Sequence, residues 1–371
     1  MTASTVLYVG GDRWDRVAGT DRRIALALAA DAPVLWIDPP LPIVSRGPSE
    51  PRTPKLSDVA PGITRLRTSG PPLASKPIMR GLADRIMSSS VRRAVGDLNA
   101  DVEAIVVASA RGSFPSGVPG ARVLYVTDDW FAGAGLMGLD SGTVRRRLER
   151  NLAEATLVCA VSPYLRDQLE ERYGVHAELV PNGCDPVDNA RLPGATRVEA
   201  ALVGQLNERL EIGVLERVSE SGVPILVIGP RTERDADTGH RLDAFLARPN
   251  VTWLGELPYT ELPARLASVG VGLTPYADTE FNRSSFPLKT LEYIASGLPV
   301  VSTDLPAVRW LDTDLVSIAG SADDFADKVA RTLSCKQSAD DLRRRREFAI
   351  AHSWRARADS LRAVIRAGAT G

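Results

Sequence analysis

Short, continuous runs of apolar residues recur along the chain and alternate with segments of helical periodicity. Runs that lack polar alternation are typical of strands covered on both faces. The order of strand, helix and strand therefore predicts an α/β protein with doubly wound parallel sheets. The predicted strands are residues 5–11, 32–38, 102–109, 121–127, 155–162, 199–205, 223–230, 250–256, 269–276 and 298–303.

Two stretches rich in Pro, Gly and turn residues interrupt this pattern. Residues 39–77 predict a long loop, and a loop of that length is usually functional. Residues 180–197 have no periodicity and indicate a linker between domains. We therefore place a first domain at 1–185 and a second at 186–352, with a final helical segment at 353–371.

Length and composition restrict the class of protein. The 371 residues suggest two domains, and 44% hydrophobic with 25% charged residues is typical of a globular protein. A net charge of -1 gives the chain no electrostatic reason to bind nucleic acid. Three widely spaced Cys favour a reducing compartment, and no apolar run reaches membrane-spanning length. We expect a cytoplasmic protein.

The segment SSFPLKTLEYIASGLPVVSTD carries the strongest chemical signal. Ser284 or Ser285 could cap a helix, and Pro287 suits its first turn. Lys289 and Glu292 are three residues apart and so share one helix face. They are either an exposed ion pair worth about 0.3–0.5 kcal/mol, or one wall of a ligand site. In the second case the helix start and Lys289 bind phosphate, and Glu292 accepts hydrogen bonds from ribose hydroxyls.

This segment resembles the donor site of GT-B glycosyltransferases, particularly family 4 and enzymes of the teichuronic acid type. Other stretches resemble the same family in the same order along nearly the whole chain, most specifically over residues 178–312. They are GGDRWDRVAGTDRRIALALA, LVPNGCD, LVGQLNERLEIGVL, VTWLGELPYTELPARLASVGVGLTPY and HSWRARADSLRAVI. The resemblance implies two Rossmann-like domains that face a cleft, with a C-terminal helix crossing back to the first domain.

The resemblance also implies a division of labour. The second domain binds a nucleotide-diphosphate sugar, and the first domain, with loop 39–77, binds the acceptor. Ser284 stands where the family has a sugar-binding Glu, and Gln205 stands where it has a phosphate-binding Arg, which Arg209 is expected to replace. The expected donor-binding residues are Arg209, Gly229, Gly255, Ser284, Ser285, Phe286, Pro287, Leu288, Lys289 and Glu292.

Candidate residues of the first domain follow two predicted strands. Gly10, Gly11 and Asp12 form a loop whose small residues would let a ligand approach the backbone. Asp128 and Asp129 follow the strand at 121–127, and either could be a general base for an acceptor hydroxyl. The alternatives are hydrogen bonding to a sugar, or capping of the next helix.

These features predict a glycosyltransferase that moves a sugar from a nucleotide sugar to an acceptor hydroxyl. Family 4 favours retention of anomeric configuration, whereas an Asp base fits inversion. A non-catalytic nucleotide-sugar-binding partner and a sugar-nucleotide epimerase remain alternatives. We expect no metal and no cofactor beyond the co-substrate, because the three His are scattered and no H-E-x-x-H motif appears. The Arg clusters at 145–147 and 343–346 are either solvated faces or a peripheral contact with the inner face of the membrane, which a lipid-linked acceptor would need.

Overall fold

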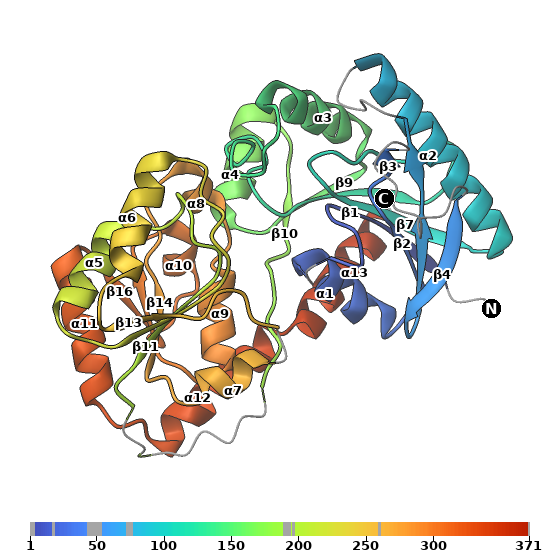
Figure 1. Cartoon of the computed structure of the whole chain (residues 1–371). Helices are drawn as coiled ribbons and strands as arrows, with labels where there is room; N and C mark the ends of the chain where they lie inside the picture. Colours follow the sequence, from blue (N-terminus) through green and yellow to red (C-terminus); the bar gives the residue numbers. More distant parts are fainter. Residues whose placement is uncertain are drawn as a thin grey trace. The chain divides into compact units, whose positions relative to one another are not determined.

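The chain forms two compact α/β units in a computed structural model that describes residues 4–16, 19–42, 54–71, 77–187, 194, 197–258 and 261–369 (Figure 1). Unit 1 comprises Met1–Asn182 and Trp354–Gly371, and unit 2 comprises Gly183–Ser353. Each unit is built around its own sheet, and we describe each by itself.

The sheet of unit 1 has the strand order β10-β9-β8-β7-β1-β2-β5-β4. Neighbouring strands are parallel except β4 and β5, which form an antiparallel edge. All six residues of β1 are buried, as expected of a central strand covered on both faces. The strands are β1 (Thr5–Gly10), β2 (Val34–Ile37), β4 (Lys55–Ala60), β5 (Ile63–Arg67), β7 (Val102–Ala108), β8 (Ala121–Val126), β9 (Leu157–Ala160) and β10 (Glu178–Leu179).

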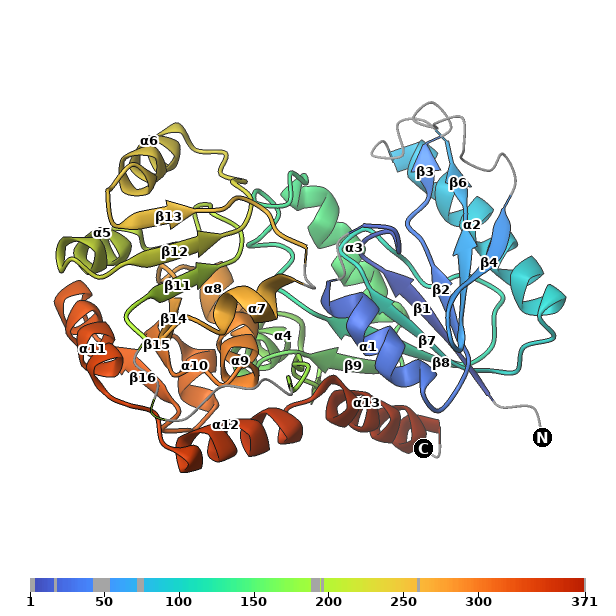
Figure 2. The same ribbon diagram turned by 60° about the horizontal axis from the view of Figure 1, so that its bottom comes forward.

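Helices α1 (Thr20–Ala29), α2 (Pro77–Asp97), α3 (Ser141–Glu154) and α4 (Pro163–Tyr173) connect these strands. The last helix, α13 (Trp354–Ala369), belongs to the same unit and lies beside α1 (Figure 2). Its apolar side chains recur every three or four residues and are buried, which explains its docking. They are Trp354, Ala358, Leu361 and Ile365.

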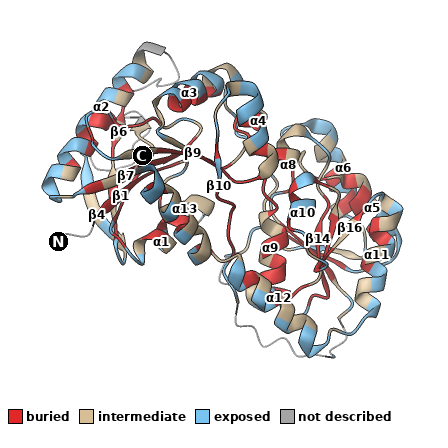
Figure 3. Ribbon diagram, turned by 180° about the vertical axis from the view of Figure 1, so that it is seen from behind, coloured by how far each residue is buried: buried red, intermediate tan, exposed pale blue. Residues whose placement is uncertain are grey.

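The sheet of unit 2 is wholly parallel, with the order β13-β12-β11-β14-β15-β16. Most of its strand residues are buried (Figure 3) because helices cover both faces, although the edge strand β13 is partly exposed. The strands are β11 (Ala200–Val203), β12 (Ile225–Ile228), β13 (Val251–Trp253), β14 (Val271–Thr274), β15 (Val300–Thr303) and β16 (Val316–Ala319). The helices are α5 (Ile212–Glu220), α6 (Ala236–Leu246), α7 (Leu262–Leu266), α8 (Glu280–Ser284), α9 (Leu288–Ala295), α10 (Pro306–Trp310), α11 (Ala322–Ser334) and α12 (Ala339–Ala351).

Each of the ten predicted strands is present, but the expected loop at 39–77 is partly wrong. It contains the short strands β3 (Leu41–Pro42) and β6 (Ser69–Gly70) as well as the β4–β5 hairpin. The hairpin turns at Gly62, whose φ of 73° favours glycine. Strand β4 is half exposed along its length and so has no continuous apolar run. Residues 43–53 and 72–76 lie outside the described residues.

Candidate functional site

Helix α9 is fixed to the sheet of unit 2 by one buried tyrosine. The ring of Tyr293 lies against Gly272 of β14, where an added Cβ would come within 2.4 Å of the ring. Its hydroxyl donates to Ala201 O at 3.0 Å and accepts from Val203 N at 2.7 Å. The start of α9 is therefore held at the carboxyl end of β11, where ligands of parallel sheets bind. Sequence reasoning missed Tyr293, because its aromatic ring reads as ordinary core.

Lys289 and Glu292 form an ion pair on one side of α9. The Nζ–Oε2 distance is 2.6 Å, and the side chains are 28% and 19% exposed. Both line a small hollow within unit 2, next to Val203. The Lys289 side chain lies near Gly204, with its Cε 3.8 Å from where a Cβ would stand. The predicted pair therefore shares one face, with its two charges beside open glycine backbone.

The serines before α9 do not cap it, contrary to expectation. Ser284 is the last residue of α8, and its hydroxyl donates back to Glu280 O at 3.0 Å. Ser285 donates in the same way to Phe281 O at 2.8 Å. The N-cap of α9 is Pro287. Ser284 is fully buried, so its side chain belongs to the packing of α8 and does not face a donor.

The segment from Ser285 to Leu288 also offers fewer free amides than expected. Ser285 N donates to Phe281 O at 3.0 Å, and Leu288 N donates to Phe286 O at 2.8 Å. Pro287 has no N–H, so the segment offers at most the amide of Phe286. The helix start therefore cannot bind phosphate through several free amides of this segment, and any phosphate here would depend on Lys289 and the first turn of α9.

Arg209 connects the loop after β11 to α8 and to the segment before it. Its guanidinium lies 5.1 Å from the ring centroid of Tyr276 and 4.9 Å from that of Phe281. Its Nε donates to Asn282 Oδ1 at 2.9 Å, and Asn282 Nδ2 donates back to Arg209 O at 2.9 Å. This arrangement supports a positioning role, and the expected phosphate contact stays a prediction.

Gly229 and Gly255 lie after β12 and β13, as the sequence predicts, but they contact each other. Gly229 N donates to Gly255 O at 2.7 Å. A Cβ on Gly229 would stand 1.8 Å from Gly204 O, at a φ of 143°. Gly229 is therefore required by the close approach of two backbone segments. Neither Gly229 nor Gly255 lines the hollow beside Lys289.

A larger pocket of about 530 Å³ lies in unit 1, at the carboxyl ends of β1, β7 and β8. Its walls come from the segments 11–16, 19–22, 108–111 and 127–139, together with Trp36. Residues 39–77, expected to bind the acceptor, contribute no lining residue within the described parts of that range. Three predicted residues do line the pocket, namely Gly11, Asp12 and Asp128.

Gly10 has a different reason to be glycine. A Cβ there would come within 2.5 Å of the Trp36 ring, so Gly10 accommodates a buried indole and does not open the backbone to a ligand. Asp129 is likewise structural. It is 6% exposed, and its Oδ1 accepts from Phe131 N at 3.1 Å and Ala132 N at 2.9 Å. The local-cap interpretation fits Asp129, while Asp128 faces the pocket.

Asp21, on the first turn of α1, is a pocket carboxyl that sequence reasoning missed. Its Oδ2 accepts from Gly11 N at 2.8 Å, and its Oδ1 accepts from Tyr8 OH at 3.2 Å. Desolvation is the main cause that raises the pKa of Asp21 to about 7. The hydrogen bonds from Gly11 and Tyr8 lower this pKa, and the nearby charges of Asp12 and Asp128 raise it by smaller amounts. The sequence signal, an acidic residue at a helix start, indicates only an ordinary first turn.

The described part of the chain contains no cluster of three or more His, Cys, Asp or Glu side chains that could hold a metal ion. Among the same residues, no helix is long and apolar enough to cross a membrane. The Arg clusters expected as solvated faces or membrane contacts are engaged in ion pairs. These are Arg145 with Glu149, Arg147 with Asp84, Arg343 with Glu347 and Arg344 with Asp314.

Comparison with known proteins places this geometry in context. Residues 203–335 match the family described as glycosyl transferases group 1. A Bacillus subtilis protein named as a teichuronic acid biosynthesis glycosyltransferase, TuaH, is 26% identical over 173 residues. That alignment covers 43% of this chain and 43% of the relative, so the match spans less than half the length of the curated relative.

Solved structures resemble the chain over almost its whole length. Sucrose-phosphate synthase from Thermosynechococcus elongatus has a TM-score of 0.72 at 17% identity, with 98% of each chain covered. Trehalose-phosphate synthase (UDP-forming) from Burkholderia xenovorans, in complex with glucose-6-phosphate, has 0.68 at 14%, covering 98% of this chain and 100% of that one. Anabaena HepE, in complex with UDP and glucose, has 0.60 at 12%, with 98% of each covered. The predicted α/β GT-B fold and the resemblance to group 1 glycosyltransferases are confirmed.

Proposed function

We propose that the protein is a glycosyltransferase that moves a sugar from a nucleoside diphosphate sugar to an acceptor hydroxyl. The observation that carries this proposal is the Lys289–Glu292 pair at the first turn of α9, within the residues that match the glycosyltransferase family. The pair lines a hollow beside the carboxyl end of β11, where Gly204 leaves the backbone open.

The two side chains suit two parts of one donor. The carboxylate of Glu292 accepts hydrogen bonds from the ribose diol, and the ammonium of Lys289 binds the diphosphate as a point charge. Because the two charges neutralise each other at 2.6 Å, the pair occupies this largely apolar hollow without an unpaired charge. The similarity to proteins bound to UDP makes a uridine nucleotide the first donor to test.

We propose that catalysis needs no metal and no further cofactor. In this mechanism Lys289 and the positive end of α9 stabilise the charge that develops on the leaving diphosphate. With most amides of the preceding segment engaged, Lys289 carries the larger share of that task. Lys289→Met should therefore lower kcat more than it raises the KM for donor, because the charge grows only as the bond breaks.

The acceptor binds in the pocket of unit 1, with its hydroxyls near Asp128 and Asp21. We propose retention of anomeric configuration, in line with the group 1 resemblance. NMR of the product tests this, and an inverted anomer would reject retention and assign the acceptor proton to a pocket carboxylate.

The test is a panel of nucleoside diphosphate sugars, with binding followed by thermal shift and turnover by release of the nucleoside diphosphate. We expect one donor to stabilise the wild-type protein and to be consumed only when an acceptor is present. Tight binding without turnover under any acceptor would reject the enzyme in favour of a binding protein. Conversion of the donor sugar to its epimer without an acceptor would reject transfer in favour of epimerisation.

A further inference from the structure

Four arginines line the pocket of unit 1, and three of them have no carboxylate partner among the described residues. Arg13 is paired, 3.4 Å from Asp15. For Arg16, Arg22 and Arg111, the described residues place no carboxylate within ion-pair distance, although all three line the pocket. A pocket of about 530 Å³ is within the range of small-molecule sites. Guanidinium groups that line one pocket without an ion-pair partner match an oxyanion in shape and charge.

Arg22 is held in a defined position. Its guanidinium carbon lies 4.6 Å from the centroid of the Trp14 ring, and its Nη1 donates to Trp14 O at 3.2 Å. Trp14 is itself fixed, because its N–H donates to Asp38 Oδ1 at 3.0 Å. Asp38 is buried and also accepts from Arg65 Nε at 2.7 Å. The loop after β1 is thereby anchored to β2 and β5.

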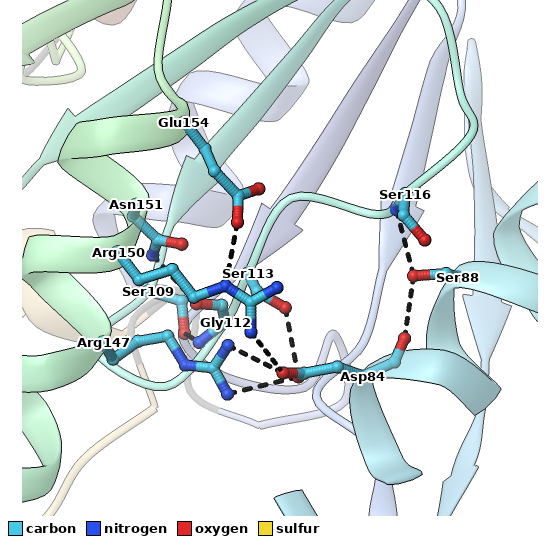
Figure 4. A network of polar contacts seen from close by, with 10 residues as sticks. All are labelled: Asp84, Ser88, Ser109, Gly112, Ser113, Ser116, Arg147, Arg150, Asn151 and Glu154. Carbon is cyan, nitrogen blue, oxygen red and sulfur yellow. Dashed lines mark hydrogen bonds and ion pairs between the residues drawn. The ribbon is translucent and has the colours of Figure 1, made fainter. Parts of the chain in front are cut away.

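The loop that carries Arg111 is anchored by a separate network (Figure 4). Asn151 of α3 donates to Gly112 O at 3.0 Å, and Gly112 N donates to Ser109 Oγ at 3.0 Å. The next residue of this loop, Ser113, donates to Asp84 of α2 at 3.1 Å, and Asp84 also forms an ion pair with Arg147. The backbone on both sides of Arg111 is thus fixed before any ligand arrives. A fixed site loses less free energy on ordering when it binds.

The arginines share their pocket with acidic groups. Asp12, Asp21 and Asp128 line the same walls. Carboxyl groups accept hydrogen bonds from sugar hydroxyls but repel an anion, so the pocket has two kinds of partner for one ligand. A neutral sugar would bring no counter-charge to the guanidinium groups, and an inorganic anion alone would offer these carboxyl groups no hydroxyl donors.

We propose that the acceptor is a sugar bearing an oxyanion, a phosphate or a carboxylate, which Arg16, Arg22 and Arg111 bind. Asp21 and Asp128 accept hydrogen bonds from its hydroxyls. This inference rests on the proposed function, because it takes the pocket of unit 1 as the acceptor site. It goes further in naming the chemical class of the acceptor and the side chains that select it.

The test begins with binding in the absence of donor. A hexose 6-phosphate, a hexuronate, the neutral hexose and inorganic pyrophosphate are titrated by calorimetry into the wild-type protein, Arg22→Gln and Arg111→Gln. Arg145→Gln is the matched control, because Arg145 is exposed and pairs only along α3 with Glu149 at 2.9 Å. We expect one charged sugar to bind at least tenfold more tightly than the neutral hexose. Each pocket variant should weaken that binding roughly 10- to 100-fold.

The outcomes are distinct. Equal binding of charged and neutral sugars, or unchanged affinity in Arg111→Gln, would overturn the inference, and Arg111 is exposed enough to be replaced without unfolding. Pyrophosphate could instead bind as tightly as the charged sugar, with a raised KM for donor in both variants. That result would assign the arginines to the donor diphosphate and would also overturn the inference. Transfer to a neutral acceptor at the same rate as to a charged acceptor would reject the inference while leaving the proposed function intact. A protein that binds no nucleotide sugar would reject the proposed function instead.

Discussion

Glu292→Ala should abolish most of the stabilisation by nucleotide sugar while leaving the unliganded protein almost as stable as before. The Lys289–Glu292 pair is 28% and 19% exposed and spans i,i+3, so its loss should cost only about 0.3–0.5 kcal/mol. A carboxylate that binds a ribose diol is worth more, about 1.5–3 kcal/mol. The variant should therefore bind donor roughly 10- to 150-fold more weakly.

These values convert directly into a melting shift. Donor at 100 times its Kd stabilises the wild-type protein by about 2.7 kcal/mol. At the same concentration, a 50-fold weaker site gives about 0.7 kcal/mol. For a unit of this size, each kcal/mol moves Tm by about 2–4 °C, so a shift of about 5–10 °C should fall to about 1–3 °C.

The matched control is Glu216→Ala, which breaks a similarly exposed pair with Arg241, 3.0 Å away on another helix of unit 2. It should keep the full donor-induced shift. If every nucleotide sugar shifts Glu292→Ala as far as the wild-type protein, the donor site is not at α9. If Glu292→Ala melts more than about 10 °C below wild type without ligand, Glu292 is structural and the reasoning fails.

Three further changes test other parts of the structure. Gly229→Ala should abolish folding of unit 2, because its Cβ would lie 1.8 Å from Gly204 O. Gly255→Ala should cost only about 1–2 kcal/mol, because no atom lies within 4 Å of its added Cβ. Equal denaturation midpoints for the two variants would refute this. The wild-type protein should lose stability between about pH 4 and pH 8, because a carboxyl whose pKa rises to about 7 on folding stabilises the fold at low pH and loses that contribution as it ionises. Asp21→Asn should remove this loss. If urea denaturation shows the same dependence of unfolding free energy on pH in both proteins, the idea is wrong. Tyr293→Phe should weaken donor binding by freeing α9 from Ala201 O and Val203 N, with a stability loss of about 1–3 kcal/mol, and donor affinity equal to wild type would contradict it.

Most of the sheet strands could be predicted because they are buried on both faces and so leave an uninterrupted apolar run. Strands β4 and β5 escaped the same reasoning, since β4 is half exposed and its pattern mixes Lys, Ser and Asp with apolar residues. The β4–β5 hairpin is stabilised by pairing between its two strands and by the turn at Gly62. The surrounding sequence is rich in Pro and Gly, so this turn could not be distinguished from an ordinary loop. Local pattern therefore predicted the centre of each sheet better than its edge.

In the candidate site, too, positions set by local geometry could be predicted, whereas those set by other contacts could not. Lys289 and Glu292 could be predicted to share a face because helix geometry alone places them together. Ser284 could not be assigned, because its hydroxyl bonds within the short helix α8, whose residue Asn282 is contacted by the distant Arg209. Asp21 was missed because its partners, Tyr8 and Gly11, come from a strand and a loop rather than from its own helix.

The docking of α13 on α1 has a consequence for synthesis of the chain. Unit 1 is discontinuous, and its last helix leaves the ribosome only after all of unit 2. Until then the apolar side of α1 lacks the cover that Leu361 and Ile365 later take part in forming. Unit 2 is continuous and can complete its core first, whereas unit 1 must wait with an apolar surface open. Nascent unit 1 should therefore be the half that chaperones hold during translation.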